Sequence, residues 1–554
     1  MKSFRPRKSN GKRVLLLEPN YQNKYPPVGL MKLATYHRIQ GWKIVFFKGD
    51  LSRFVAERLT FALIAELGAD YPERNWGFCF ETFCDYVWKG RDAGLSEMSC
   101  EWGDALVDVL SRLKESRAKY LNGEYFKMHE WNRVLVTTLF TFYADITIET
   151  IKFAQRLEPE EIEVGGIMAS VVPDYIQKET GIAPTTGVLA VNKIFDDKPI
   201  SELIDNLPLD YSILEEIDYR FPSEDAFFGH TTRGCPNKCA FCAVPVLEPE
   251  YQSFRSLKDK LAYERKRFGE RPNLLLMDNN VFASERFKDI IAEIEEAGFG
   301  KGEKITRSDE LAICAARIRE GYNPRAYVRK GCALLRDWLE HLRGESQAVI
   351  GELYWRLRLN VALCEELDVP IYSFPMKYHP IKDPKYFSNR DFLGEHWCRK
   401  YIRFVQLVLN STMGKVGRGK TFFFKAFGES TEDFREMLLM PEYMIRFRLD
   451  CEAAGVTARW KDALHKLSKE DEKQFRECLM YNEFQVRDES RESKDFRRLL
   501  AFYRDSPTFS SISDTTRKRM VAEFDERLRD TSARLTEADI EREIEAAKSW
   551  AYSF

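Results

Sequence analysis

The amino-terminal part of the chain alternates short apolar runs with helical spacing, and this alternation constrains the fold more than any other feature. Residues 13–19 (RVLLLEP) and 42–50 (WKIVFFKGD) are apolar runs of strand length. Between them, residues 28–40 carry apolar side chains at helical spacing and stop at Gly41. A strand, a loop, a helix and a second strand in this order are typical of a parallel, doubly wound α/β sheet.

After an interruption, the same alternation resumes. The interruption at 51–130 is rich in aromatic and charged residues, and we expect it to be an inserted helical segment. The sheet that resumes beyond it would bind ligands at the carboxyl ends of its strands. Its further elements are expected as strands at 133–142, 161–166 and 186–191 and as helices at 146–157 and 174–181.

A second α/β pattern begins at residue 226, after an acidic segment with three prolines that is typical of a linker. Its strand at 273–280 ends in a polar loop, and a later strand is expected at 369–378. The chain beyond residue 396 is charged and shows mainly helical spacing. The expected organisation is a first domain at 1–195, a linker at 196–224, a second domain at 225–395 and a mainly helical domain at 396–554.

Charge and cysteine content limit the class of protein. Lysine plus arginine (85) nearly balances aspartate plus glutamate (87), which argues against a uniformly basic nucleic-acid coat. The longest apolar stretch, residues 134–144, is too short to span a membrane, and no apolar segment of a signal peptide follows the basic residues 1–13. We therefore expect a cytoplasmic protein with no membrane partner, whose twelve cysteines are mostly reduced.

Three of the cysteines form one tight cluster directly after the apparent strand at residue 226. Cys235, Cys239 and Cys242 are spaced C-x3-C-x2-C, and thiolates are the natural ligands of iron–sulfur clusters. Zinc usually takes a fourth Cys or His, and no histidine lies within ten residues after Cys242. The spacing favours a 4Fe–4S cluster with one iron open to a ligand from outside the protein. Three buried structural cysteines are the alternative.

This motif, with an aromatic residue (Phe241) before the third cysteine and a Gly-Cys-Pro turn at its start, resembles the signature of the radical S-adenosylmethionine (SAM) superfamily. The resemblance implies that the open iron binds SAM and that an electron from a flavodoxin- or ferredoxin-type donor cleaves it. The 5′-deoxyadenosyl radical then abstracts hydrogen from a substrate. Phe241 would lie behind the adenine.

The resemblance also assigns residues beyond the cysteines. The family carries a Gly-Gly-Glu-like motif after its second barrel strand, and here Asp278, Asn279 and Asn280 occupy that place and would bind the methionine end of SAM. A plain turn is the alternative reading of Asp-Asn-Asn.

A later apparent strand ends at residues 376–378, so its carboxyl end is expected to face the same cavity. Met376 would contact the cofactor, while Lys377 and Tyr378 are the catalytic candidates. Between residues 300 and 351 the sequence reads mainly as helix, and the third, fourth and fifth barrel strands of the family are not apparent. The resemblance therefore implies a partial or modified (β/α) barrel.

The amino-terminal domain resembles the cobalamin-binding-type domain of a large radical SAM subgroup. The resemblance lies in residues 18–41 (EPNYQNKYPPVGLMKLATYHRIQG) and 164–170 (VGGIMAS). The D-x-H-x-x-G motif that supplies a cobalt-ligating histidine is absent, so bound cobalamin and a structural or substrate-binding remnant both stay open. The implied fold is a Rossmann-like, doubly wound domain, a partial radical SAM barrel and a helical carboxyl-terminal domain.

Other motifs carry less weight. Residues 414–421 (GKVGRGKT) match the Walker A pattern, but the preceding segment reads as a helix, whereas a P-loop follows a strand. Residues 399–425 hold seven basic residues, no acid and interleaved aromatics, which suits nucleic-acid contact or pairing with acidic helices. Cys79, Cys84 and Cys100 are expected to be buried thiols rather than a second cluster.

The sequence thus predicts a radical SAM enzyme that modifies an unidentified substrate by methylation, rearrangement or modification of a nucleic acid or peptide. Two alternatives stay open. One is a non-catalytic sensor or scaffold that binds SAM and the cluster, and the other is a nucleic-acid-binding protein with a structural cluster.

Overall fold

The structure, a computed structural model, falls into two compact units. The first comprises the described residues up to 299 together with 379–388, and the second comprises the other described residues from 353 onward. The residues that the structure describes are 11–98, 102–188, 204–237, 239, 242–299, 353–354, 357–358, 361, 378–388, 392–394, 397–412, 420–484 and 492–504.

A parallel four-stranded sheet forms the centre of the first unit, with strand order β2-β1-β3-β4. Helix α1 (Val28–Ile39) connects β1 to β2, and α6 (Ala144–Arg156) connects β3 to β4. The predicted α/β sheet is confirmed, and its order is compatible with a Rossmann-like domain. The four strands are β1 (Arg13–Glu18), β2 (Lys43–Lys48), β3 (Arg133–Thr138) and β4 (Glu161–Gly166).

The strand expected at 186–191 does not form in its described part, residues 186–188. Thr185 still donates its backbone N–H to the carbonyl of Val164 in β4, at 2.7 Å. The next turn ends the pairing, because Gly187 has a positive φ of 71° and its N–H donates to the hydroxyl of Ser170. The Ser170 side chain therefore accepts from the backbone N–H that a fifth strand would need for pairing with β4.

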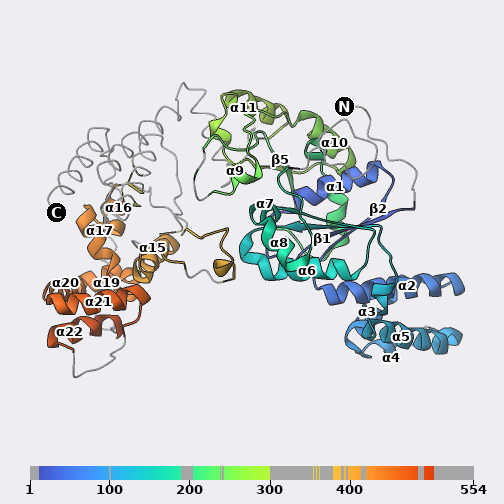
Figure 1. Cartoon of the computed structure of the whole chain (residues 1–554), viewed down its shortest axis with the longest axis horizontal. Coiled ribbons are helices and arrows are strands. Elements are labelled where there is room, and N and C mark those ends of the chain that lie inside the picture. Colours follow the sequence, from blue (N-terminus) through green and yellow to red (C-terminus); the bar gives the residue numbers. More distant parts are fainter. Residues whose placement is uncertain are drawn as a thin grey trace. The chain divides into compact units, whose positions relative to one another are not determined.

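Alternate residues of the strands face opposite sides of the sheet and build two separate cores. Leu15 and Leu17 point toward α6 and the inserted helices, whereas Val14 and Leu16 point toward α1. Figure 1 shows α1 on one face of the sheet and α2 and α6 on the other. Because β1 is buried on both faces, its sequence is a continuous apolar run.

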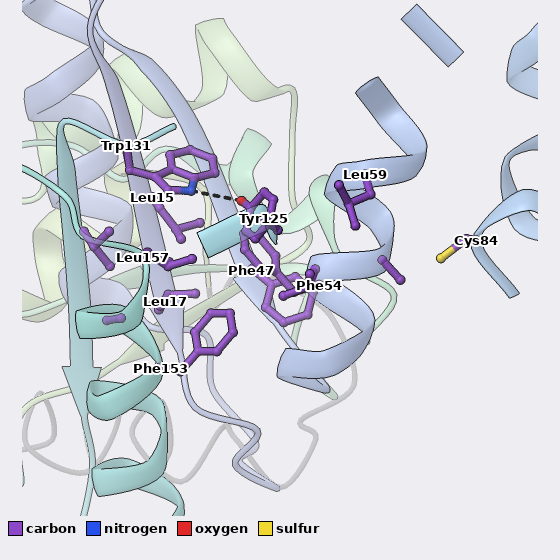
Figure 2. Packing of buried hydrophobic residues seen from close by; sticks show 14 of the residues in the cluster. Leu15, Leu17, Phe47, Phe54, Leu59, Cys84, Tyr125, Trp131, Phe153 and Leu157 are labelled. Carbon is purple, nitrogen blue, oxygen red and sulfur yellow. Dashed lines mark hydrogen bonds between the residues drawn. The ribbon is translucent and has the colours of Figure 1, made fainter. Parts of the chain in front are cut away.

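The inserted segment is helical, as predicted, and covers one face of the sheet. Helix α2 (Leu51–Asp70) starts at Asp50, whose carboxylate accepts from the N–H groups of Ser52 and Arg53. Its Phe54 packs against Trp131 and Phe153, and the Trp131 indole donates to the Tyr125 hydroxyl at 3.2 Å (Figure 2). The rest of the insertion is α3 (Phe80–Lys89), α4 (Leu95–Met98) and α5 (Leu106–Leu121), with 3-10 turns at Trp76–Cys79, Gly103–Ala105 and Glu124–Lys127.

Two cysteines of the insertion are buried thiols, as predicted. Cys79 and Cys84 lie within the apolar core, and burial raises the pKa of the Cys84 thiol to about 12. A thiol in such surroundings is a poor metal ligand, because ligation requires the thiolate. Cys100 lies outside the described residues.

The connection between the two sheets is packed, although its acids and prolines predict a linker. The described part from residue 204 to 221 contributes Leu207, Leu209, Tyr211 and Ile213 to the core that contains α1. Tyr211 donates from its hydroxyl to Glu264, at 3.4 Å, and accepts from the N–H of Phe228. The connection therefore joins the two sheets into one unit instead of acting as a free tether.

The second sheet of this unit is a short βαβ motif. Strands β5 (Ala226–Gly229) and β6 (Asn273–Leu276) are parallel, and α10 (Lys258–Phe268) connects them. Helix α11 (Phe287–Glu296) follows β6, and the short helix α9 (Val244–Leu247) lies in the loop after β5. Residues 300–351, where no barrel strands are apparent in the sequence, and all but the last residue of the strand expected at 369–378 lie outside the described residues.

The second unit is helical in its described part, as predicted for the carboxyl-terminal region. Its core is built around Trp460, Phe404 and Phe434, all fully buried. Its helices are α15 (Arg399–Thr412), α16 (Lys420–Phe427), α17 (Thr431–Leu438), α18 (Glu442–Arg446), α19 (Arg448–Ala453), α20 (Val456–His465), α21 (Lys469–Tyr481) and α22 (Lys494–Arg504).

This arrangement bears on the two weaker motifs. The Walker-like residues 414–421 follow helix α15 and not a strand, so the context that a P-loop requires is absent at this place. In the basic stretch, Arg403 pairs with Glu442 at 2.8 Å and Lys425 with Glu452 at 2.7 Å. For these two residues the structure favours pairing with acidic helices over nucleic-acid contact.

Among the helices of the described residues, none combines the length and the apolar character needed to cross a membrane.

Candidate functional site

The loops after β5 and β6 lie next to each other because the two strands are parallel and in register. Gly229 at the end of β5 is opposite Leu276 at the end of β6, and Met277 donates its N–H to the Gly229 carbonyl at 2.8 Å. The cysteine motif follows β5, and Asp278 to Asn280 follow β6. The fold therefore brings the two predicted motifs to one edge of the sheet.

The cysteine loop is closed at its base by backbone hydrogen bonds, and we call this base the neck (residues 231–233 and 252–255). Arg233 and Gln252 exchange two backbone hydrogen bonds, of 3.1 and 2.9 Å, and Arg255 donates its N–H to the Thr231 carbonyl at 2.7 Å. Gly234 has a φ of 67°, and a Cβ there would lie 2.5 Å from the Glu250 carbonyl oxygen. Only glycine fits where the loop leaves the neck.

Asp278 ties the exit of β6 to the neck. Its carboxylate accepts from the N–H and the hydroxyl of Thr231, at 3.1 and 3.0 Å, and from the N–H and the hydroxyl of Thr232, the latter at 2.6 Å. Both threonines are buried. The structure thus gives Asp278 a positioning contact within the protein, which the sequence did not indicate.

The two asparagines after Asp278 reach the cysteine loop. Asn280 donates from Nδ2 to Sγ of Cys235 at 3.6 Å, and Asn279 donates from Nδ2 to Oε2 of Glu248 at 3.1 Å. Each side-chain carbonyl remains able to accept a hydrogen bond from a bound ligand.

The three cysteines are free thiols with N–H donors near two of their sulfurs. Cys235 and Cys242 are half-buried and Cys239 is exposed. Val244 donates its N–H to Sγ of Cys242 at 3.4 Å, and Asn280 donates to Cys235. Hydrogen bonds to sulfur are one way in which proteins tune iron–sulfur clusters, so this donor set fits such a cluster. Within the described part of the chain, no three His, Cys, Asp or Glu residues are gathered in a metal-binding arrangement.

Sequence reasoning missed two carboxylates that hold the neck. Glu248 accepts from the Arg233 guanidinium and from the N–H of Gly234, the latter at 2.6 Å. Asp205 pairs with Lys32, Arg233 and Arg255 at 2.6, 2.7 and 2.6 Å. Burial alone would raise the pKa of Asp205, but the three cations hold it well below its ordinary value. No local pattern marks either acid, since only their distant partners distinguish them.

Of the remaining predicted site residues, the structure describes only Tyr378. Phe241, Met376 and Lys377 lie outside the described residues. Tyr378 is 52% exposed, its ring lies 5.4 Å from that of Phe392, and it belongs to the second unit.

The ligand-binding edge of the first sheet is filled by its own side chains. Tyr21, after β1, is fully buried, and its ring centroid lies 4.8 Å from that of Tyr143, after β3. Its hydroxyl also forms a 2.6 Å hydrogen bond with the hydroxyl of Thr147. Doubly wound sheets of this order bind ligands between β1 and β3. Because these two loops are in direct contact, the residues present do not fit a corrin ring there.

A buried ion pair lies beside Tyr21. Lys48 donates from Nζ to the Tyr21 carbonyl at 2.7 Å and to Oδ1 of Asn23 at 2.8 Å, and it lies 3.5 Å from Oε2 of Glu18. Burial raises the pKa of Glu18 to about 7, although Lys48 and Asn23 oppose this shift, and burial lowers the pKa of Lys48. Tyr219 from the connection covers the pair, with its ring centroid 4.6 Å from Nζ.

We expect the Glu18→Gln variant to lose a pH dependence of stability. The folded-state pKa of about 7 lies above the ordinary pKa of 4.5 for a glutamate, so the folded protein binds this proton more tightly than the unfolded chain does. The contribution is therefore full below about pH 4.5 and is lost as the pH rises through 7. Between pH 5 and 8 the free energy of unfolding of the wild type should fall by about 2–3 kcal/mol more than that of the variant. Urea unfolding at both pH values measures this, and equal falls in the two proteins would contradict the assignment.

A scan against protein-family models found no match to this chain, and searches of the curated proteins and of the solved structures found none either.

Proposed function

We propose that the chain is a radical SAM enzyme in which Cys235, Cys239 and Cys242 hold a 4Fe–4S cluster. One observation carries the proposal. The parallel strands β5 and β6 bring the C-x3-C-x2-C loop and the polar loop after β6 together, with Nδ2 of Asn280 3.6 Å from Sγ of Cys235. Adjacent loops at the carboxyl ends of parallel strands are where such folds build active sites.

When bound and reduced, a cluster of this kind supplies the electron that cleaves SAM to methionine and a 5′-deoxyadenosyl radical. The chain's own residues position the reactants. The side-chain carbonyls of Asn279 and Asn280 suit the ammonium group of the methionine end. Asp278 holds their loop against the neck. Val244 and Asn280 donate N–H groups to the sulfurs of Cys242 and Cys235. These hydrogen bonds stabilise the negative charge on the two thiolates.

The residues predicted from the resemblance complete the proposal. Phe241 would lie behind the adenine and Met376 would contact SAM, while Lys377 and Tyr378 are the catalytic candidates for the modification of the substrate. A partial barrel would enclose this site, and a flavodoxin- or ferredoxin-type protein would deliver the electron.

The test is anaerobic reconstitution of the full chain with iron and sulfide, followed by dithionite and SAM. We expect about four irons per chain and the release of 5′-deoxyadenosine. Four irons without 5′-deoxyadenosine would overturn the enzymatic proposal and favour a sensor or scaffold. A chain that takes up no iron would refute the cluster itself.

A further inference from the structure

One carboxylate links the first sheet to the neck of the cysteine loop. Oδ1 of Asp205 accepts from Lys32 at 2.6 Å and from Arg233 at 2.7 Å, and Oδ2 accepts from Arg233 at 3.1 Å and from Arg255 at 2.6 Å. Lys32 belongs to α1 of the first sheet. Arg233 and Arg255 lie on the two sides of the neck, so Asp205 joins three segments that are far apart in the sequence.

The four charged side chains are shielded from water, so an unpaired charge among them would destabilise the neck. The side chains of Asp205 and Lys32 are each 9% exposed, and those of Arg233 and Arg255 are 14% and 12% exposed. Removing one partner of a buried ionic group leaves uncompensated charge, which is much more costly than at the surface. Without the Asp205 charge, three cations would face one another at the neck.

Arg233 carries the effect from Asp205 into the cysteine loop. It lies two residues before Cys235, and its guanidinium also pairs with Glu248. Glu248 in turn accepts from the N–H of Gly234 and from Asn279 of the loop after β6. The orientation of Arg233 therefore affects both loops of the candidate site.

We propose that Asp205 is a positioning residue that fixes the cysteine loop to helix α1, so that the amino-terminal α/β domain is a structural part of the cluster site. The role of Asp205 at a cluster site rests on the proposed function. Its effect on the cysteine loop can be tested in the metal-free chain, whether or not that function is correct. It assigns the amino-terminal domain a role that needs no cofactor of its own, in keeping with the filled edge of its sheet.

Asp205→Asn tests the proposal, and Asp210→Asn is the matched control. Asp210 lies in the same connection, is buried and pairs with Arg38 of α1 at 2.6 Å. Among the described residues, its carboxylate accepts from Arg38 and Ser212, which both lie outside the neck. The first readout is the alkylation rate of each cysteine in the metal-free full chain, measured by peptide mass spectrometry. We expect the half-buried Cys235 and Cys242 to react several-fold faster in Asp205→Asn and at the wild-type rate in Asp210→Asn.

The second readout is the electron paramagnetic resonance spectrum of the reconstituted, reduced protein with SAM. A positioning role predicts an altered spectrum or lowered iron retention in Asp205→Asn, with recovery in Asp205→Glu. If Asp205→Asn does not fold, Lys32→Met provides the test, since it removes the contact with α1 and leaves Asp205 paired with two arginines. We expect faster alkylation and an altered spectrum in this variant too, but with smaller changes than in Asp205→Asn.

Wild-type alkylation rates in Asp205→Asn or in Lys32→Met, or equal acceleration in Asp205→Asn and Asp210→Asn, would overturn the proposal. A wild-type protein that takes up no iron would refute the proposed function, and the alkylation comparison would still decide the role of Asp205.

Discussion

Replacing Cys239 with alanine is expected to reduce 5′-deoxyadenosine formation to background and to lower the bound iron well below that of the wild type. The three thiolates are the complete set of protein ligands in the proposed cluster, so losing one opens a second iron to solvent. Cys239 is exposed, and substitutions at such positions usually change folding stability little. The loss can therefore be assigned to the ligand and not to the fold. Iron and sulfide analysis and chromatography of the product measure both effects.

Cys478→Ala is the matched control. Cys478 is a partly buried cysteine of the helical unit, and we expect its variant to keep the wild-type iron content and product yield. If Cys239→Ala retained full iron and full product, Cys239 would not be a ligand. If both variants lost iron, the loss would reflect a general effect of removing thiols.

The first sheet was predictable because each of its elements has a strong local pattern. The strand at 13–18 lies between helices on both faces, which is why its residues form an unbroken apolar run. Helix α1 begins and ends within one residue of the expected bounds, since Pro27 precedes it and Gly41, with a φ of 84°, lies just past its end. The cysteine motif was also visible, because its spacing is local.

The contacts that organise the candidate site could not be read from the sequence. Asp205 and Lys32 are 173 positions apart, and Asp278 and Thr231 are 47 positions apart. The acids and prolines of the connection have the composition of a linker, and nothing local shows that Asp205 is surrounded by three cations or that Tyr211 is buried. Asp278 was predicted to bind the cofactor because it occupies the place of the family's Gly-Gly-Glu-like motif. Its oxygens in fact accept hydrogen bonds from Thr231 and Thr232, and nothing in the sequence indicates that these residues lie next to it.

The contacts of Asp278 lead to the second large prediction, which separates stability from SAM binding. We expect Asp278→Ala to lower the free energy of unfolding by about 3–5 kcal/mol, because it leaves four donors of the buried Thr231 and Thr232 without an acceptor. Asp289→Ala is the control, since this carboxylate is 54% exposed and pairs only at the surface with Arg286, so its loss should cost less than about 1 kcal/mol. Urea unfolding followed by tryptophan fluorescence measures all three proteins.

Asn280→Ala should show the opposite pattern. Its amide, from the loop after β6, contacts Sγ of Cys235, so under the proposed function we expect wild-type stability with SAM affinity weakened roughly tenfold, the effect of losing one contact of about 1.4 kcal/mol. Equilibrium dialysis of reconstituted protein with labelled SAM measures the affinity. An Asp278→Ala protein with wild-type stability and lost SAM affinity would contradict this division, because the carboxylate would then serve the cofactor and not the neck. The division follows from geometry, since a carboxylate whose oxygens already accept four hydrogen bonds has little capacity left for an ammonium group.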